Sequence, residues 1–142
     1  MPTLFTRIIN GEIPGRFVWK DDDVVAFLSI GPLSDGHVLV VPRAEVDKWT
    51  DAPPELMAKL ITVAQAIGQA QVKVFGSERA GLTIAGFEVD HLHLHVWPAN
   101  SLADFDFSRA ETDPDQERMA ENAERLRAGL REAGYGEFVP EA

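Results

Sequence analysis

Short apolar runs separated by turn residues dominate the first hundred positions of the chain. These runs are rich in Val, Leu, Ile and Phe, which are enriched in β-strands, and most are bounded by Gly, Pro, Asp or Ser. They predict five strands, over residues 17–20, 23–28, 37–42, 82–85 and 91–97. Only acidic residues separate the first two runs, so we expect those two strands to form a hairpin.

A long segment with a different period follows the third run. Residues 51–75 predict a helix, with Asp51 as its cap, prolines in the first turn and Gly76 after its end. Its apolar residues recur at helical spacing and are Leu56, Leu60, Val63, Ile67 and Val74. A stripe of this kind is typical of core packing, although a cofactor-binding helix can also carry one.

A second helix is predicted over residues 113–133, from Asp113 as a cap to Gly134 as a stop, and a short one over residues 4–10. Helices and strands are thus segregated rather than alternating. This arrangement indicates an α+β fold: an antiparallel five-stranded sheet with one long central helix and a C-terminal helix. At 142 residues, the whole chain (1–142) fits a single domain.

The charge and composition of the chain limit its partners. The net charge is −10 and no basic run exceeds a residue or two, which disfavours nucleic-acid binding along a phosphate backbone. A small anionic ligand is still compatible, because the local field of a pocket can oppose the net charge. The absence of cysteine excludes disulfides and thiolate metal sites and fits a cytoplasmic protein. We expect no membrane association, since the apolar runs are too short to span a bilayer and no signal-peptide pattern is visible.

Three of the four histidines stand at alternate positions of the last predicted strand. Residues two apart in a strand lie on one face, roughly 6.6 Å apart, so His91, His93 and His95 should share a face while Leu and Val between them line the other. Two chemistries explain such a face. Histidines at i and i+2 can share a zinc ion, or one neutral imidazole can attack phosphorus while its neighbours donate hydrogen bonds and carry protons. The strand alone does not decide between them, and it does not place His37.

The histidine run is one of several motifs by which the chain resembles the histidine-triad (HIT) family of nucleotide hydrolases and transferases. The stretch from His91 to Trp97 matches the family signature His-x-His-x-His followed by apolar residues. Three further matching segments occur in the family's order and read FTRIINGEIPGRFVWKDDDVVAF, GHVLVVP and AGFEVDH. The resemblance covers residues 4 to about 105, the expected core of a HIT-like domain, and leaves a C-terminal helical extension over about 113–134.

The resemblance implies a metal-independent enzyme with a nucleotidyl-histidine intermediate. His93 is the implied nucleophile toward the α-phosphate of a nucleotide, and water then releases the mononucleotide. His95 is implied to contact the phosphate and to assist the leaving group. The backbone carbonyl of His91 is implied to orient the nucleophile, with His37 supporting His91. No cofactor and no metal are expected, and the cysteines that hold a structural zinc in some relatives are absent.

The purine pocket of the family draws on apolar residues near the N-terminus. The matching positions also fit an ordinary core role, and they are Phe5, Ile8, Ile13, Phe27 and Ile30. Ser29 stands where relatives carry an Asp or Asn that holds the ribose hydroxyls. Serine can make one such hydrogen bond but not the bidentate pair of a carboxylate.

Two departures from the family pattern precede the histidines. Phe87 replaces a glutamine, and Glu88 replaces a small hydroxyl residue that donates to the phosphate in relatives. A carboxylate accepts hydrogen bonds but does not donate them, and it repels a phosphate. We therefore expect Glu88 to turn away from the site; the alternative is a substrate other than an adenosine phosphoramidate.

These features predict a hydrolase of nucleotide phosphoramidates or related nucleoside 5′-phosphate derivatives. The resemblance also implies a homodimer in which two sheets join edge to edge and the long helices pack across the axis. It further implies that Trp97, Phe105 and Phe107 belong to a region that approaches the partner's site. Two alternatives stay open: a nucleotide-binding module with little turnover, and a metal-dependent hydrolase that uses the same histidines.

Overall fold

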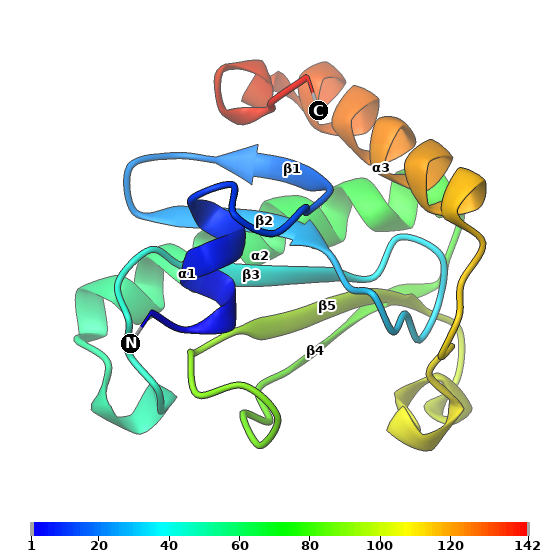
Figure 1. The fold of residues 1–142 in the computed structure, drawn as a ribbon. Coiled ribbons are helices and arrows are strands. Elements are labelled where there is room, and N and C mark those ends of the chain that lie inside the picture. The colour runs from blue at the N-terminus through cyan, green and yellow to red at the C-terminus, as the bar shows by residue number, and fades with distance from the viewer. Residues whose placement is uncertain (1, 142) are drawn as a thin grey trace.

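A five-stranded antiparallel sheet forms the centre of the structure, a computed structural model that describes residues 2–141 (Figure 1). In sheet order the strands are β1 (Phe17–Lys20), β2 (Val24–Leu28), β3 (Val38–Pro42), β5 (Leu94–Ala99) and β4 (Arg79–Thr83). The hairpin expected of β1 and β2 is present, and all neighbouring strands run antiparallel. The predicted α+β class is confirmed.

Three α-helices accompany the sheet: α1 (Leu4–Ile9), α2 (Pro54–Phe75) and α3 (Gln116–Leu130). Helix α2 lies across one face against β3, β4 and β5, and α3 packs on α2 and on β1 (Figure 1). Short helical turns complete the chain at Trp49–Asp51, Leu102–Phe105, Phe107–Arg109, Arg131–Tyr135 and Gly136–Phe138. Within residues 2–141, no helix is long and apolar enough to cross a membrane.

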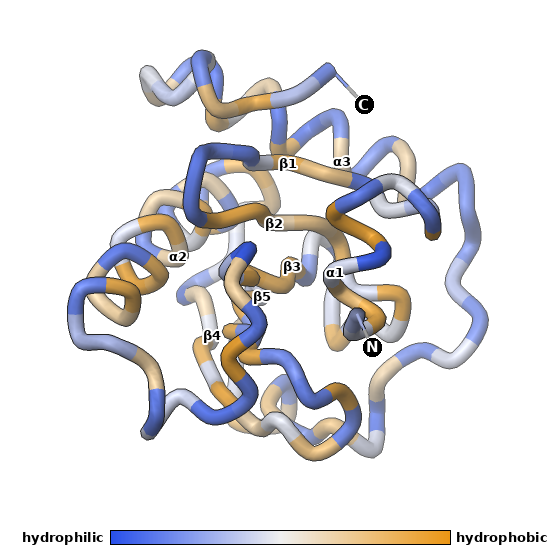
Figure 2. The backbone as a smooth tube through the Cα atoms, turned by 60° about the vertical axis from the view of Figure 1, so that its left-hand side comes forward, coloured by the Kyte–Doolittle hydropathy of each residue, from blue (hydrophilic) through white to orange (hydrophobic). Residues whose placement is uncertain are grey.

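Both faces of the sheet are covered, so its central strands are apolar on both sides. The larger core lies between the sheet and the helices α2 and α3, and includes Ile67, Leu94 and Leu126. A smaller cluster lies on the opposite face beneath α1 and contains Phe5, Ile8, Phe17, Val25, Phe27, Leu39 and Val41. All residues of β2 and β3 are buried as a result. Figure 2 shows apolar (orange) segments along these strands and hydrophilic (blue) loops around them.

Both long helices begin later than predicted. Asp51 does not cap α2 but ends the short turn Trp49–Asp51, and α2 starts at Pro54. The reason is the Pro-Pro pair: a residue before proline is pushed out of the helical region, and Pro53 is extended with ψ 141°. Helix α3 is capped by Asp115 rather than Asp113, because the Asp115 side chain accepts the backbone N–H of Arg118.

The last two strands are also displaced from their predicted positions. Strand β4 covers 79–83 rather than 82–85, and β5 covers 94–99 rather than 91–97. The pairing of β3 with β5 reaches Val40 opposite Leu94 and then stops. Strand β3 ends at Pro42, which has no N–H to extend the ladder. His91 and His93 therefore precede the strand, and only His95 lies within it.

Gly36, the residue before His37, offers a test of this packing. Its φ is +88°, and a Cβ at this position would lie 2.3 Å from the Phe75 ring. Gly76 also has a positive φ (+67°) but has nothing within 4 Å of a Cβ. Gly76→Ala should lower the free energy of unfolding by about 1–2 kcal/mol, and Gly36→Ala by about 1–3 kcal/mol more. Chemical denaturation of both variants measures the difference, and equal losses would show that the Phe75 contact does not restrict this turn.

Candidate functional site

The alternation predicted for the three histidines holds, although only His95 is part of the strand. Leu92, Leu94 and Val96 point into the core beneath α2. The histidines point to the opposite face, where the Phe5 ring lies 5.7 Å from His91 and 4.9 Å from His93, centroid to centroid. Because Phe5 comes from α1, this helix covers the histidines and shields them from water.

Three of the four histidine rings, those of His37, His95 and His93, lie next to one another. The ring of His93 lies 5.0 Å from that of His95, and the ring of His37 lies 5.2 Å from His95 on the other side. His37 directly precedes β3, and β3 is the neighbour of β5 in the sheet. The pairing of these two strands thus brings together residues that are 58 positions apart.

The hydrogen bonds of His93 leave one lone pair free. Its Nδ1 lies 2.7 Å from the backbone carbonyl oxygen of His91. A carbonyl oxygen only accepts, so Nδ1 carries the hydrogen and donates. In the neutral ring, Nε2 then has no hydrogen and keeps its lone pair. Nε2 is without a hydrogen-bond partner among residues 2–141, which is the state that a nucleophile requires.

The hydrogen bonds of His95 leave an N–H group free instead. The backbone N–H of Leu33 donates to His37 Nδ1 at 2.9 Å, so neutral His37 carries its hydrogen on Nε2. His37 Nε2 lies 3.0 Å from His95 Nδ1 and donates to it. Neutral His95 therefore carries its own hydrogen on Nε2. His93 and His95 present complementary atoms: a lone pair on the first and a donor on the second.

His91 is held on both sides of its ring, away from His37. Its Nε2 donates to the carbonyl of Pro42 at 2.7 Å, and its Nδ1 accepts from the Thr3 hydroxyl at 2.6 Å. The expectation that His37 supports His91 is wrong, because His37 contacts His95. Register explains the difference: His37 precedes Val38, which pairs with Val96 in β5.

Burial keeps the central histidines neutral. Burial, together with the smaller effect of one neighbouring histidine in each case, lowers the pKa of His37 to about 3 and the pKa of His95 to about 4. Burial also lowers the pKa of His93, against the opposing effects of the hydrogen bond to His91 and the charge of Glu88. The two free ring atoms are thus a lone pair on neutral His93 and a hydrogen-bond donor on neutral His95.

These hydrogen bonds also bear on metal binding. Of the eight ring nitrogens, six are engaged by protein groups, and only His93 Nε2 and His95 Nε2 are free. Catalytic zinc takes three protein ligands. Across residues 2–141, no three His, Cys, Asp or Glu side chains are grouped to hold a metal ion. In this hydrogen-bonding arrangement the histidines offer two free ring nitrogens, one fewer than the three protein ligands of a catalytic zinc ion.

A cavity of about 290 Å³ opens at the free histidine atoms. This histidine cavity is lined by His93 and His95 together with Phe5, Ser29, Ile30, Leu39, Glu88 and Phe107. An apolar pocket of about 230 Å³ adjoins it and shares Phe5, Ile30 and Leu39 with it. A ligand with a phosphate at the histidines can therefore extend an apolar group into the second space.

The apolar pocket contains most of the residues predicted for purine binding. Phe5, Ile8, Phe27 and Ile30 line it. Phe5, Ile8 and Phe27 are also part of the smaller apolar cluster, so they combine core and pocket roles. Ile13 lines neither cavity and packs behind the cluster, so its place in a pocket is not supported.

Ser29 lines the histidine cavity, where its hydroxyl accepts the backbone N–H of Gly31. That bond leaves the hydroxyl hydrogen available as a donor. Phe107 also reaches this cavity, and its ring meets His95 edge-on at 5.2 Å within its own chain. Trp97 and Phe105 lie behind it, with Trp97 against His37.

Glu88 does not turn away from the site, contrary to expectation. It lines the histidine cavity with His93 and His95, whereas Phe87 is 95% exposed. The expectation assumed strand-like alternation up to His91, but residues 84–93 form no strand. Sequence reasoning also missed Arg16, Gln116 and Met119, which line the apolar pocket. Gln116 and Met119 belong to α3, and no motif near them indicated a site.

The family follows from a match to known sequences. The HIT domain model matches residues 10–102. The chain belongs to the HIT family. An uncharacterized HIT-like protein of Mycobacterium tuberculosis is 33% identical over 125 residues, covering 82% of this chain and 87% of that protein. The purine nucleoside phosphoramidase of Escherichia coli is 32% identical over 104 residues, covering 66% of this chain and 84% of that protein.

Solved structures of HIT proteins share the fold. A Zn-bound histidine triad family protein from Mycobacterium smegmatis superposes with a TM-score of 0.80 at 29% identity, over 94% of this chain and 96% of that one. A HIT-like protein involved in cell-cycle regulation from Bartonella henselae superposes with a TM-score of 0.77 at 32% identity, over 89% of this chain and 95% of that one. The predicted family and HIT-like fold are confirmed.

The neutral state of His37 has a measurable consequence for stability. A histidine in the unfolded chain titrates near pH 6.5, whereas native His37 has a pKa of about 3. Between these two pH values, the unfolded chain binds a proton at this position that the native protein does not. The free energy of unfolding therefore falls as the pH is lowered, by up to about 1.4 kcal/mol per pH unit for each such histidine. His37→Gln keeps a side-chain acceptor and a donor. This variant should lower the slope of the unfolding free energy against pH by the contribution of about one proton.

Chemical denaturation of wild type and His37→Gln at several pH values in this range measures the two slopes. Acid-sensitive groups that do not contact His37 contribute equally to both proteins and cancel in the difference. Identical slopes would mean that His37 is already protonated in the native protein.

Proposed function

We propose that this protein hydrolyses nucleoside 5′-phosphoramidates or related nucleoside 5′-phosphate derivatives through a covalent intermediate on His93, without a metal. One observation carries the proposal: the free lone pair of His93 and the free N–H of His95 open into one cavity, with an apolar pocket beside it. The pocket suits a nucleobase, and the histidine pair suits the α-phosphate. The name of the E. coli relative, a purine nucleoside phosphoramidase, supports this substrate class.

The histidines divide the reaction between them. His93 Nε2 attacks the α-phosphorus, and the bond from phosphorus to the leaving nitrogen breaks with its electron pair passing to nitrogen. That nitrogen takes a proton from water, and the amine departs. A water molecule then attacks phosphorus, the bond to Nε2 breaks, and His93 regains its lone pair. The attacking water releases one proton, which balances the proton taken by the amine.

The remaining histidines act through orientation and charge. His95 Nε2–H donates to a phosphate oxygen, on which negative charge accumulates in the transition state. His37 fixes the tautomer of His95 through its Nε2–H, and the His91 carbonyl fixes that of His93. A metal-dependent hydrolase is the second candidate, because the M. smegmatis relative is described as Zn-bound. A nucleotide-binding module with little turnover is the third, since Glu88 adds a negative charge to the cavity.

Release of AMP from adenosine 5′-monophosphoramidate in excess chelator separates the three candidates. We expect turnover by the wild type and a loss of about 10³-fold or more in His93→Ala, as for removal of a covalent nucleophile. A thermal melt of the variant confirms that it is folded. Turnover abolished by chelator and restored by zinc would favour the metal enzyme. Saturable AMP binding without product would favour the binding module.

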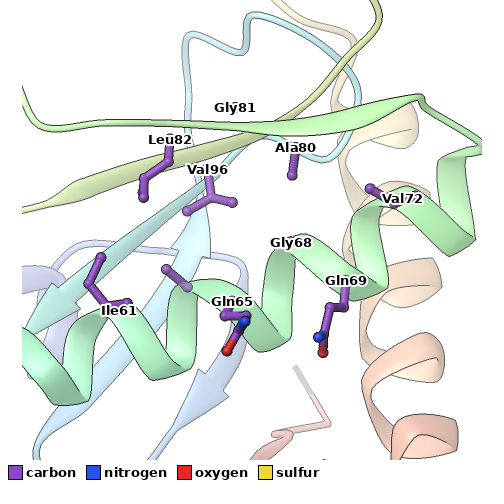
Figure 3. A pocket seen from close by; sticks show the side chains of 10 residues that line it. Ile61, Gln65, Gly68, Gln69, Val72, Ala80, Gly81, Leu82 and Val96 are labelled. Carbon is purple, nitrogen blue, oxygen red and sulfur yellow. The ribbon is translucent and has the colours of Figure 1, made fainter.

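We also propose that the protein forms a homodimer through the surface of α2 and β4. Strand β4 is an edge of the sheet, and an apolar groove runs between it and α2 (Figure 3). The groove is floored by small residues, among them Gly68 and Ala80, and bordered by exposed Ile61 and Leu82. An unpaired edge beside apolar side chains suits a second copy that extends the sheet and packs its own α2 alongside.

Light scattering coupled to gel filtration tests the dimer. Leu82→Glu places a charge in the groove and should convert a dimer into monomers, because a buried unpaired charge opposes association. Leu4→Glu is the matched control, since Leu4 is equally apolar and similarly exposed (43%, against 47% for Leu82) but lies on α1, on the opposite face of the sheet from the groove. A wild-type mass of one chain, or dissociation by both variants, would contradict this interface.

A further inference from the structure

The apolar pocket has a polar part, formed by two side chains from distant segments of the chain. Among the described residues that line the pocket, only Arg16 and Gln116 have polar side chains. Arg16 directly precedes β1, and Gln116 is the first residue of α3. The pocket shares Phe5, Ile30 and Leu39 with the histidine cavity, but neither of these two residues. The polar side chains therefore belong to the part of the pocket wall that the histidine cavity does not share.

The guanidinium of Arg16 is held on one side only. Its Nη2 donates to the backbone carbonyl of Gln116 at 3.1 Å and to the side-chain Oε1 of the same residue at 3.2 Å. Its Nη1 has no hydrogen-bond partner among residues 2–141, and its Nε is buried without one. Arg16 also forms no ion pair within this range. It thus brings an unpaired positive charge and unengaged N–H donors to a wall that is otherwise apolar.

The side-chain amide of Gln116 is engaged at both ends. Its Oε1 accepts from Arg16, and its Nε2 donates to the backbone carbonyl of Pro114 at 3.0 Å. The amide is thus used to hold Arg16 and the chain before α3. At this part of the pocket, the atoms that are wholly unengaged belong to Arg16, and all of them are donors.

These donors distinguish between the two common purines. Guanine presents two acceptors side by side, O6 and N7, and an Arg guanidinium pairs with both at once. Adenine presents N7 beside the N6 amino group, which is itself a donor. A guanidinium has no acceptor to offer that amino group. An adenine in the same position would leave two donors facing one another, at a cost in binding free energy.

The order of groups in a nucleotide brings the relevant edge of the base toward Arg16. The proposed reaction places the phosphate at the histidines, and the ribose joins the phosphate to N9 of the base. N9 is then directed toward the histidine cavity. The six-membered ring, which carries position 6, lies on the far side of the base from N9. It therefore reaches the wall that Arg16 and Gln116 form.

Helix α3 contributes to this wall although it lies outside residues 10–102, the segment that matches the HIT domain model. It supplies Met119, which is 5% exposed and lines the pocket beside Gln116. Through its two contacts with Arg16, Gln116 also fixes the position of the guanidinium. The C-terminal extension thus helps to form the part of the pocket that meets the base.

We infer that Arg16, held in place by Gln116, selects guanine over adenine. The inference rests on the proposed function and names its substrate class: 5′-phosphoramidates of guanosine and inosine. Inosine is included because its base keeps O6 and N7 and lacks only the 2-amino group of guanine. The contact is remote from the reacting phosphorus, so it stabilises the ground state and the transition state equally. The preference should therefore appear in KM and leave kcat unchanged.

The 5′-monophosphoramidates of guanosine, inosine and adenosine test the inference under identical conditions. We expect the kcat/KM of the wild type for guanosine and for inosine to exceed that for adenosine by about 10-fold, within the range of a bidentate Arg–guanine pair. An inosine value equal to the adenosine value would overturn the inference, because recognition would then depend on the 2-amino group rather than on O6.

The matched variants are Arg16→Met, Arg16→Lys and Arg7→Met. Methionine keeps a long apolar side chain but removes every donor, so the guanosine-to-adenosine ratio should fall to about one. Lysine keeps the charge but not the planar fork, and its ratio should be intermediate. Arg7 is exposed and lines neither cavity, so its variant should keep the wild-type ratio. If Arg16 had only a structural role, Arg16→Met would weaken turnover of all three substrates equally, and the inference would be wrong.

A wild-type ratio of one would likewise overturn the inference while leaving the hydrolase intact. Absence of turnover with all three substrates would instead contradict the proposed function. The pocket is then tested alone, by calorimetric titration of GMP, IMP and AMP into the wild type and Arg16→Met. Tighter binding of GMP and IMP than of AMP, lost in Arg16→Met, would support the guanine site. A preference that Arg16→Met retains, equal binding of all three nucleotides, or no binding would overturn it.

Discussion

The hydrogen bond from His93 Nδ1 to the His91 carbonyl is the contact on which the rest of the site depends. A carbonyl inside a β-ladder is already bonded to a neighbouring strand, and it would be less available to a side chain. The His91 carbonyl is free because the β3–β5 ladder stops at Leu94, opposite the end of β3 near Pro42. The same proline supplies the carbonyl that holds the His91 ring. The end of the strand pairing thus sets the tautomer of His93.

Burial of the histidines costs folding free energy, and the packing of the apolar scaffold offsets this cost. Imidazole rings that stay neutral well below their ordinary pKa oppose folding in acid, because the unfolded chain binds protons that the native chain does not. Helix α1 places Phe5 over His91 and His93, and β2 and β3 are buried on both faces. The packing that excludes water therefore also keeps His93 unprotonated. Stability and the neutral state of His93 depend on the same contacts.

The sequence predicts the parts of this structure that rest on local pattern. Alternating His and Leu placed three rings on one face even though the strand begins only at Leu94, since an extended chain alternates whether or not it is paired. The features that the sequence did not predict correctly depend on contacts between distant segments. The partner of His37 is decided by the register of β3 against β5, and the approach of Gln116 to the apolar pocket by the docking of α3. The orientation of the Glu88 side chain was predicted wrongly, because the loop before His91 has no regular alternation that indicates which side chains face the site.

Under the proposed function, the charges of the site determine where affinity for a nucleotide comes from. No Lys or Arg lines the histidine cavity, and the histidines there are neutral, so the phosphate meets only hydrogen-bond donors and a carboxylate. Binding must then come mainly from burying a base in the apolar pocket, where Phe5 and Phe27 meet edge to face at 5.6 Å. In the proposed reaction, the mononucleotide product carries one more ionisable phosphate oxygen than the phosphoramidate substrate. The Glu88 carboxylate in the cavity would therefore repel the product more strongly than the substrate and favour its release.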